Sequence, residues 1–189
     1  MGEKMDRRKK YTRMVIKDSL IELLAEKPIV SVTVKEICEL ADVNRSTFYT
    51  HYADQYDLLT KIENEIIDDM NTYLSSYSFT KEDEALLMTQ KLVEYITDKK
   101  LMFEILLNEN GDSTFEKRLM EVARRFVMKN TMEGTDLEEH FSSYLSTYII
   151  SGAIHVIKEW IANGMKESPK EIAELINHFS NRGLSYLQE

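Results

Sequence analysis

Residues 32–52 of the chain read VTVKEICELADVNRSTFYTHY, and this stretch decides the fold of the N-terminal part. Thr33 and Glu36 have the spacing of a capping box, in which each side chain bonds the main-chain amide of the other residue. We expect this box to open a short helix that runs to Ala41 and stops at Asp42, because aspartate tolerates the left-handed backbone of a tight turn. Asn44 is a favoured N-cap and would open a second helix over residues 45–52. The stretch therefore predicts a helix-turn-helix.

The two predicted helices can pack against each other through a few apolar side chains. Ile37 with Ala41, and Phe48 with Tyr52, are pairs four residues apart, and Val43 lies in the turn between them. Packing both rings inward turns a polar set outward: Arg45, Ser46, Tyr49 and Thr50, with Thr47 and His51 at the edge. Such a set suits the major groove of DNA, because arginine can bond guanine at two atoms and hydroxyl groups both donate and accept. An ordinary helical hairpin is the alternative.

The same stretch resembles the helix-turn-helix of TetR-type transcriptional regulators. The shared pattern is a capping Thr, Ile and Ala in the first helix, Val in the turn, and an aromatic-Tyr-x-His-aromatic ending, and it extends to Leu58. The match is close over roughly the first 60 residues, whereas the rest agrees only in the number and length of its helices. The resemblance implies that Thr33, Tyr49 and His51 hold phosphates, and that Arg45, Ser46, Thr47 and Thr50 approach bases.

Three positions depart from the family's pattern. Asp42 stands where the family usually has a turn glycine, and Ser46 where a small residue or glycine is frequent, and both are tolerable. Gln55 takes the place of a lysine that commonly contacts phosphate at the start of the fourth helix. We expect Gln55 to remain a DNA contact through its amide. The slope of log K against log salt concentration should be smaller in magnitude by roughly one unit than in a relative that has the lysine.

Positive charge is concentrated at the N-terminus of an acidic chain. The net charge is -9, but residues 1–17 carry seven Lys or Arg against Glu3 and Asp6. Residues 1–60 are balanced, with ten basic and ten acidic side chains, so the whole excess of negative charge lies beyond them. A basic arm on a neutral module indicates a local contact with an anion. A merely solvated, frayed terminus is the alternative.

The rest of the chain is also predicted to be helical. Only 6 Gly and 2 Pro occur among 189 residues that are 43% apolar, which favours long helices with short connections. Gly164 has the place of a C′ glycine, and Ser168, Pro169 and Glu171 carry the signals of a helix start. We expect an all-α protein of about nine helices. Residues 1–54 would form a three-helix DNA-binding domain, and residues 55–189 a larger bundle that binds ligand and dimerises.

The last two long helices carry apolar stripes that predict a dimer. Phe141, Leu145, Tyr148 and Gly152 recur along the first, and Ile172, Ile176, Phe179, Gly183 and Tyr186 along the second. TetR-type proteins are homodimers through a four-helix interface of this kind, so the resemblance implies the same here. A core within one chain is the alternative. Residues 140–157 lack Lys, Arg, Asp and Glu, but their Ser, His and Gly content favours an interface helix over a membrane span.

Helices between about residues 80 and 130 would hold any effector pocket, because they are rich in methionine and aromatic side chains. The candidate lining residues, including two tyrosines from a later helix, are Met88, Tyr95, Phe103, Phe126, Tyr144 and Tyr148. They would suit a small apolar effector. Side chains of these types at helical spacing are also what a plain core requires, and no residue identifies a ligand.

Motifs of enzymes and metal sites are not found. None of the four His lies three residues after a Glu, and there is no glycine-rich phosphate loop. We therefore expect no enzyme, no metal and no cofactor. Cys38, the single cysteine, would be a buried core residue, and the lack of an apolar signal segment predicts a cytoplasmic protein without a membrane contact.

These observations predict a TetR-type regulator of transcription. It would be a homodimeric repressor bound to a palindromic operator in double-stranded DNA and released by a small-molecule effector. The alternative function is a helical adaptor or co-activator that has kept the fold without binding specific DNA sequences.

Overall fold

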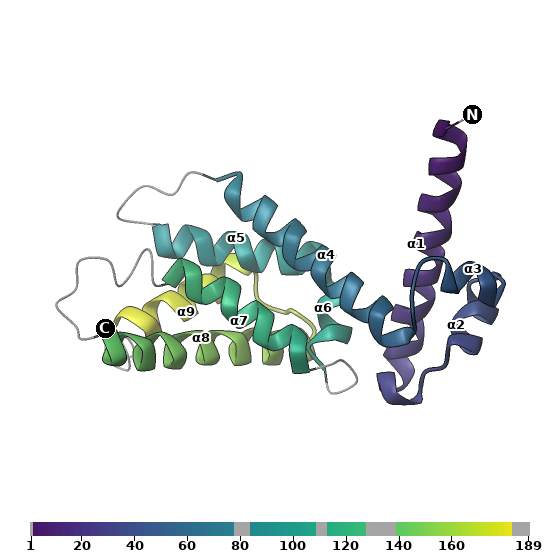
Figure 1. Cartoon of the computed structure of the whole chain (residues 1–189). Helices are drawn as coiled ribbons and strands as arrows, with labels where there is room; N and C mark the ends of the chain where they lie inside the picture. Colours follow the sequence, from purple (N-terminus) through teal and green to yellow (C-terminus); the bar gives the residue numbers. More distant parts are fainter. Residues whose placement is uncertain (1, 78–83, 109–112, 128–138, 183–189) are drawn as a thin grey trace. The chain divides into compact units, whose positions relative to one another are not determined.

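The computed structural model describes residues 2–77, 84–108, 113–127 and 139–182, and every element in these ranges is helical (Figure 1). The elements are α1 (Gly2–Glu26), the 3-10 turn η1 (Ile29–Ser31), α2 (Val34–Leu40), α3 (Arg45–Tyr49), α4 (Gln55–Ser75), α5 (Glu84–Asp98), α6 (Lys100–Leu106), α7 (Ser113–Val127), α8 (Glu139–Ala162) and α9 (Pro169–Arg182). The predicted all-α class is confirmed.

The chain divides into two compact units. The first comprises Met1–Ile66 with Ile105–Phe115, and the second Ile67–Glu104 with Glu116–Glu189. The predicted functional division at residue 54 stays a prediction, because a division by contacts does not say which residues bind DNA or ligand.

The first unit is built on the C-terminal half of α1, which packs against α2, while α2 packs against α3. Ile16, Leu20 and Leu24 lie three or four residues apart on one face of α1, and all are fully buried. Phe48 of α3 and Leu58 of α4 are also fully buried in this unit. Full burial of one such side chain stabilises a fold by about 1.5–3 kcal/mol, so this small core holds the helix-turn-helix in place.

Local signals place the ends of several helices as predicted. The amide of Glu36 donates to the hydroxyl oxygen of Thr33 (3.3 Å), and the amide of Thr33 donates to the Glu36 carboxylate (2.9 Å), which completes the capping box of α2. Ser168 and Glu171 form the same pair at α9, at 2.8 and 3.3 Å. Gly164 has the left-handed backbone of a C′ residue, with φ 86°.

The second helix of the motif is shorter than predicted. α3 ends at Tyr49 rather than Tyr52, because the amides of Thr50 and His51 bond carbonyls three residues back, at 3.2 and 2.9 Å, and so tighten the last turn. Asn44 occupies the N-cap position, but its side chain makes no capping hydrogen bond, so the expected side-chain cap is wrong.

In the second unit, α9 packs mainly against α5 and also contacts α8. Ile172 and Ile176 of α9, which the sequence assigned to a dimer stripe, are buried within their own chain at 5% and 9% exposure. That assignment is corrected, because α5 already covers this face. Gly183 and Tyr186 lie outside the described residues.

The apolar stripe on α8 faces away from the core of its own chain. Phe141, Leu145 and Tyr148 are 56%, 41% and 79% exposed, and a Cβ added at Gly152 would meet nothing within 4 Å. The buried side of α8 consists of other residues, such as Ile150. None of the helices in the described part of the chain, α8 included, is long and apolar enough to cross a bilayer.

Candidate nucleic-acid interface

The short helix α3 presents its polar side chains to solvent. Phe48 is fully buried and Tyr52 nearly so, with ring centroids 5.5 Å apart. The exposed set is Arg45, Ser46, Tyr49 and Thr50, while Thr47 and His51 are half-buried. The inward rings and the outward polar set are thus oriented as the sequence predicts, and the DNA contacts of these side chains stay predictions.

Thr50 is limited in what it can offer a base. Its hydroxyl donates to the main-chain carbonyl of Ser46 (2.8 Å), and a hydroxyl has only one hydrogen. The side chain therefore presents an acceptor oxygen and a methyl group to solvent. It suits an amino group on the base edge of cytosine or adenine, or the methyl group of thymine.

Thr33 is engaged by its own helix. Its hydroxyl donates to the Glu36 carboxylate (2.8 Å), and Lys27 donates to the other oxygen of that carboxylate (2.6 Å). These bonds, first from Lys27 and then from Thr33, lower the pKa of Glu36 to about 2. A phosphate oxygen can only accept, so the Thr33 hydroxyl can bind one only by releasing Glu36.

An open groove of about 550 Å³ brings four of the predicted DNA-binding residues together. It is lined by Val30, Val32, Thr33, Val34, Lys35, Arg45, Tyr49 and Gln55. Two of these side chains, Lys35 and Arg45, are cations, and none is acidic. This side of α3 therefore favours a polyanion.

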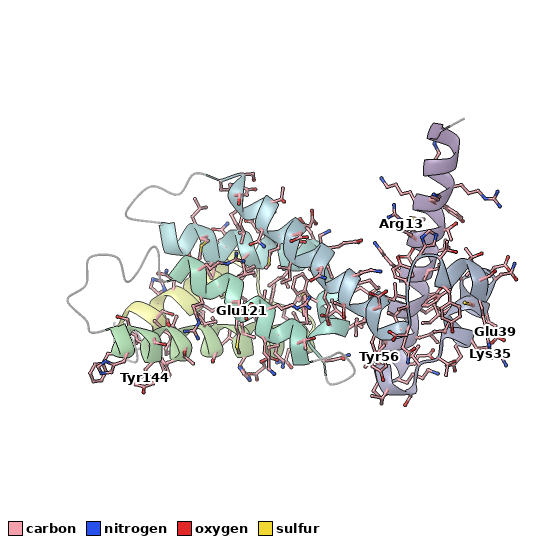
Figure 2. All side chains as sticks on the ribbon, viewed as in Figure 1. Arg13, Lys35, Glu39, Tyr56, Glu121 and Tyr144 are labelled. Atoms are coloured by element: carbon pink, nitrogen blue, oxygen red, sulfur yellow. The ribbon has the colours of Figure 1, made fainter. Side chains whose placement is uncertain are left out.

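On the other side of Arg45 the charge is mixed. A second groove, of about 510 Å³, is lined by Lys35, Cys38, Glu39, Asp42, Val43, Asn44 and Arg45. Lys35 pairs there with Glu39, one turn later on α2, at 3.7 Å, and Figure 2 labels both residues. The carboxylates of Glu39 and Asp42 disfavour phosphate, so a nucleic-acid backbone is better placed on the side of Tyr49 and Gln55.

Cations of α1 and α4 lie near the end of α3. Burial, followed by the charges of Arg13, Lys9 and Lys61, lowers the pKa of His51. The ammonium group of Lys61 donates to the carbonyl of His51 (3.0 Å) and to Asp57 (2.8 Å). His51 therefore stays neutral at neutral pH in the free protein, with cations on more than one side.

Two protein-family models match the sequence that folds this way. One, described as "Bacterial regulatory proteins, tetR family", matches residues 16–62. The other, a TetR C-terminal model described as "Transcriptional regulator C-terminal region", matches residues 83–182, more than half of the 189 residues. The chain belongs to the TetR family of transcriptional regulators.

Individual relatives agree with this membership. The TetR-family chain is 35% identical over 173 residues to the uncharacterized HTH-type transcriptional regulator YxbF of Bacillus subtilis (strain 168), covering 85% of this chain and 42% of the relative. It thus spans about two-fifths of the length of that relative.

Solved structures share the fold. A TetR transcriptional regulator from Streptococcus agalactiae 2603V is 21% identical, with a TM-score of 0.74, over 96% of this chain and 100% of the other. The regulator FadR from Bacillus subtilis, solved in complex with stearoyl-CoA, is 16% identical with a TM-score of 0.64, over 90% and 98% of the two chains.

Sequence reasoning missed two lysines near the predicted DNA-binding set of this TetR-family chain. Lys35 lines the same groove as Arg45, and Lys61 lies beside His51. A lysine two residues after the helix cap Thr33 was a usable signal for Lys35, because it places a cation in the first turn, beside the free amides. Nothing local marked Lys61, which reaches His51 only through the packing of α4.

The predicted effector residues do not all lie together. Tyr95 and Phe103 are buried, with ring centroids 6.0 Å apart, and the hydroxyl of Tyr95 donates to Asp69 (3.0 Å). Met88 is half-buried on α5, whereas Tyr144 and Tyr148 on α8 are 71% and 79% exposed. The side chain of Phe126 lies outside the described residues. The effector pocket stays a prediction.

Cys38 is buried at 4% exposure, as a core residue should be. Burial raises the pKa of its thiol, which leaves it little thiolate character. In the parts of the chain that the structure describes, no three side chains of His, Cys, Asp or Glu gather as a metal site would require.

Proposed function

We propose that two copies of this chain bind a palindromic operator in double-stranded DNA and repress transcription until a small apolar effector releases them. The observation that carries the proposal is the groove beside α3. It combines Arg45, Tyr49 and Gln55 with Lys35, and it has no acidic side chain. The proposal assigns the chain no catalytic reaction, and it places the protein in the cytoplasm, where it can reach chromosomal DNA.

The dimer is supported by the exposed apolar stripe on α8 and by Leu175 and Phe179 of α9, which are 39% and 36% exposed. A chain that keeps such side chains in water gains by covering them with a second copy. Two-fold symmetry then requires two half-sites spaced by about 34–36 Å, or by a multiple of it.

The effector is supported less directly. The solved FadR structure holds stearoyl-CoA, a ligand with a long apolar chain. In the second unit of this chain, Tyr95 and Phe103 form an aromatic core that an apolar ligand would have to enter or displace. A ligand that binds the released state better than the operator-bound state would lower operator affinity by the ratio of the two ligand affinities.

Selection of bound sequences from random duplex DNA with the purified protein tests the operator. We expect a two-fold-symmetric consensus whose half-sites lie one or more helical turns apart. Absence of any consensus, with binding that is uniform across sequences, would instead favour the adaptor or co-activator function.

Release from the selected operator tests the effector. Acyl-CoA esters of graded chain length are added to the protein–operator complex, and fluorescence anisotropy reports the fraction bound. A true effector lowers operator affinity and also raises the melting temperature of the free protein, since it binds the folded state. A compound that releases DNA without stabilising the protein is not an effector.

A further inference from the structure

The first half of α1 extends beyond the core of its own unit. α1 has 25 residues, yet none of residues 7–15 is buried, and among the side chains described from Arg7 onward burial begins at Ile16. The first turns of the helix project past α3 without another helix of the unit beside them (Figure 1). This half of α1 therefore contributes little to the hydrophobic core.

One face of this extension, which carries Lys9 and Arg13, is nevertheless distinct, and we call it the front. In a helix, residues three or four apart share a face, so Lys9 and Arg13 continue the buried line of Ile16, Leu20 and Leu24. The face that packs against the rest of the unit in the second half of α1 thus becomes cationic in the first half. Lys9 and Arg13 are both exposed.

The exposed charges described in the first half of α1 are all positive. Among residues 7–15 the charged side chains are Arg7, Arg8, Lys9, Lys10 and Arg13, and all five are exposed. The exposed acids Asp18 and Glu22 lie in the second half, about half a turn away from the line of Lys9 and Arg13. The first half therefore favours an anion, and the line of Lys9 and Arg13 differs from its other cations by continuing the face that packs on the unit.

The front of the extension lies beside the end of α3. The positive charges of Lys9 and Arg13 both lower the pKa of His51, and that of Arg13 also acts on Tyr52. Figure 2 labels Arg13 on α1. The two cations thus lie near His51, which belongs to the predicted DNA-binding set and follows the last residue of α3.

We propose that the first half of α1 is a second DNA contact, in which Lys9 and Arg13 bind phosphates of the duplex next to those held by α3. The inference rests on the proposed function and adds to it a backbone contact outside the helix-turn-helix. Phosphate contacts position a protein on DNA without reading its sequence. The first half of α1 therefore strengthens binding to every DNA sequence alike, and it increases the salt dependence of that binding.

The test compares two double variants that remove the same charge from the same helix. Lys9→Gln with Arg13→Gln changes the front, whereas Arg7→Gln with Arg8→Gln changes exposed residues on other faces. Glutamine resembles Lys and Arg in helix propensity, so circular dichroism should report equal helix content for both. The measured quantity is the slope of log K against log salt concentration on the selected operator.

We expect the front variant to reduce the magnitude of the slope by about 1.8 units, since each phosphate contact contributes about 0.9. Affinity at 0.15 M salt would then fall by about 30-fold on the operator and on unrelated DNA alike, while the control changes little. Ethylation of a single DNA phosphate weakens binding where the protein contacts that phosphate. At the phosphates that Lys9 and Arg13 contact, ethylation should weaken binding of the wild type and of the control variant but not of the front variant.

An unchanged slope for the front variant, or an equal change in both variants, overturns the arm contact. If one of these two results is found and the wild-type protein still binds a symmetric operator, the proposed function stands and only the phosphate contact of Lys9 and Arg13 fails. If the wild-type protein binds no DNA, both fail together.

Discussion

Arg45 and Tyr49 lie one helical turn apart on α3 and line the same groove, but they are expected to act differently. Arg45→Ala should cost about 1–3 kcal/mol of operator binding and relax the preference at one base pair, because it removes a two-atom contact with a base. Tyr49→Phe should weaken all sequences alike, because a phosphate contact carries no sequence information. Tyr49 is 57% exposed, so its hydroxyl can be removed without disturbing the fold.

Dissociation constants on the operator and on its single-base-pair variants distinguish the two roles. Tyr49→Phe is the matched control, since it changes one polar group on the same helix. An equal loss on every sequence for Arg45→Ala would contradict its role in reading bases.

His51 should make operator binding sensitive to pH. Burial and nearby cations lower its pKa in the free protein, so the imidazole is neutral at pH 7. A phosphate beside it favours the protonated form and raises the pKa in the complex. The complex then holds more protons than the free protein, and affinity should rise as the pH falls through the pKa of the complex.

Titration of operator affinity between pH 5.5 and 8 checks this sign, and His51→Gln provides a side chain that donates without titrating. The variant should show a flatter pH profile than the wild type. Identical profiles for the two proteins would mean that His51 takes up no proton on binding.

At the scale of the element, helix ends set by local bonds were predictable, whereas packing partners were not. Thr33 with Glu36, and Ser168 with Glu171, cap their helices because each pair lies within one turn. The burial of Ile172 could not be foreseen, because an apolar stripe does not say whether its cover is α5 or a second copy. The early end of α3 likewise depends on how the chain turns into α4.

The same difference applies to the candidate site. The outward direction of the α3 side chains follows from placing Phe48 and Tyr52 inward, which helical spacing alone supports. The groove itself could not be predicted, since it exists only where Gln55 of α4 comes beside Arg45 and Lys35.

The turn between α2 and α3 offers a test of backbone strain. Asp42 has φ 50°, a left-handed conformation that is unfavourable for residues with a Cβ. Asp42→Gly should therefore stabilise the fold, by roughly 0.5–1 kcal/mol after the extra chain entropy of glycine is counted. Glu39→Gly, three residues earlier within α2, should instead destabilise it by about 1 kcal/mol.

Urea unfolding of the two variants gives the free energies directly, and each serves as the control for the other. Destabilisation by Asp42→Gly would show that the aspartate side chain contributes more to the turn than its backbone costs.

At the scale of the whole molecule, charge and symmetry act together. Residues 61–189 carry the whole net charge of -9, which repels DNA, so the attraction must come from the neutral first 60 residues. A single set of contacts from one chain would be weakened by this repulsion. Two sets held by one dimer act at a high effective concentration, which offsets it.

Gly152 is the position at which the dimer can be tested without disturbing the chain itself. A Cβ there would meet nothing within 4 Å in its own protomer and the position is exposed, so Gly152→Arg should fold normally. If a second copy approaches α8 closely along Phe141, Leu145 and Tyr148, the arginine prevents that approach and dissociates the dimer. Ser143→Arg, an exposed site elsewhere on α8, adds the same charge as a control.

Sedimentation equilibrium should therefore show a monomer for Gly152→Arg and a dimer for both Ser143→Arg and the wild type. Operator affinity should fall with the dimer, whereas binding to a single half-site should change little. A Gly152→Arg protein that stays dimeric would place the interface on another face. The exposed stripe of α8 would then have to be covered by a surface other than α8 of a second copy.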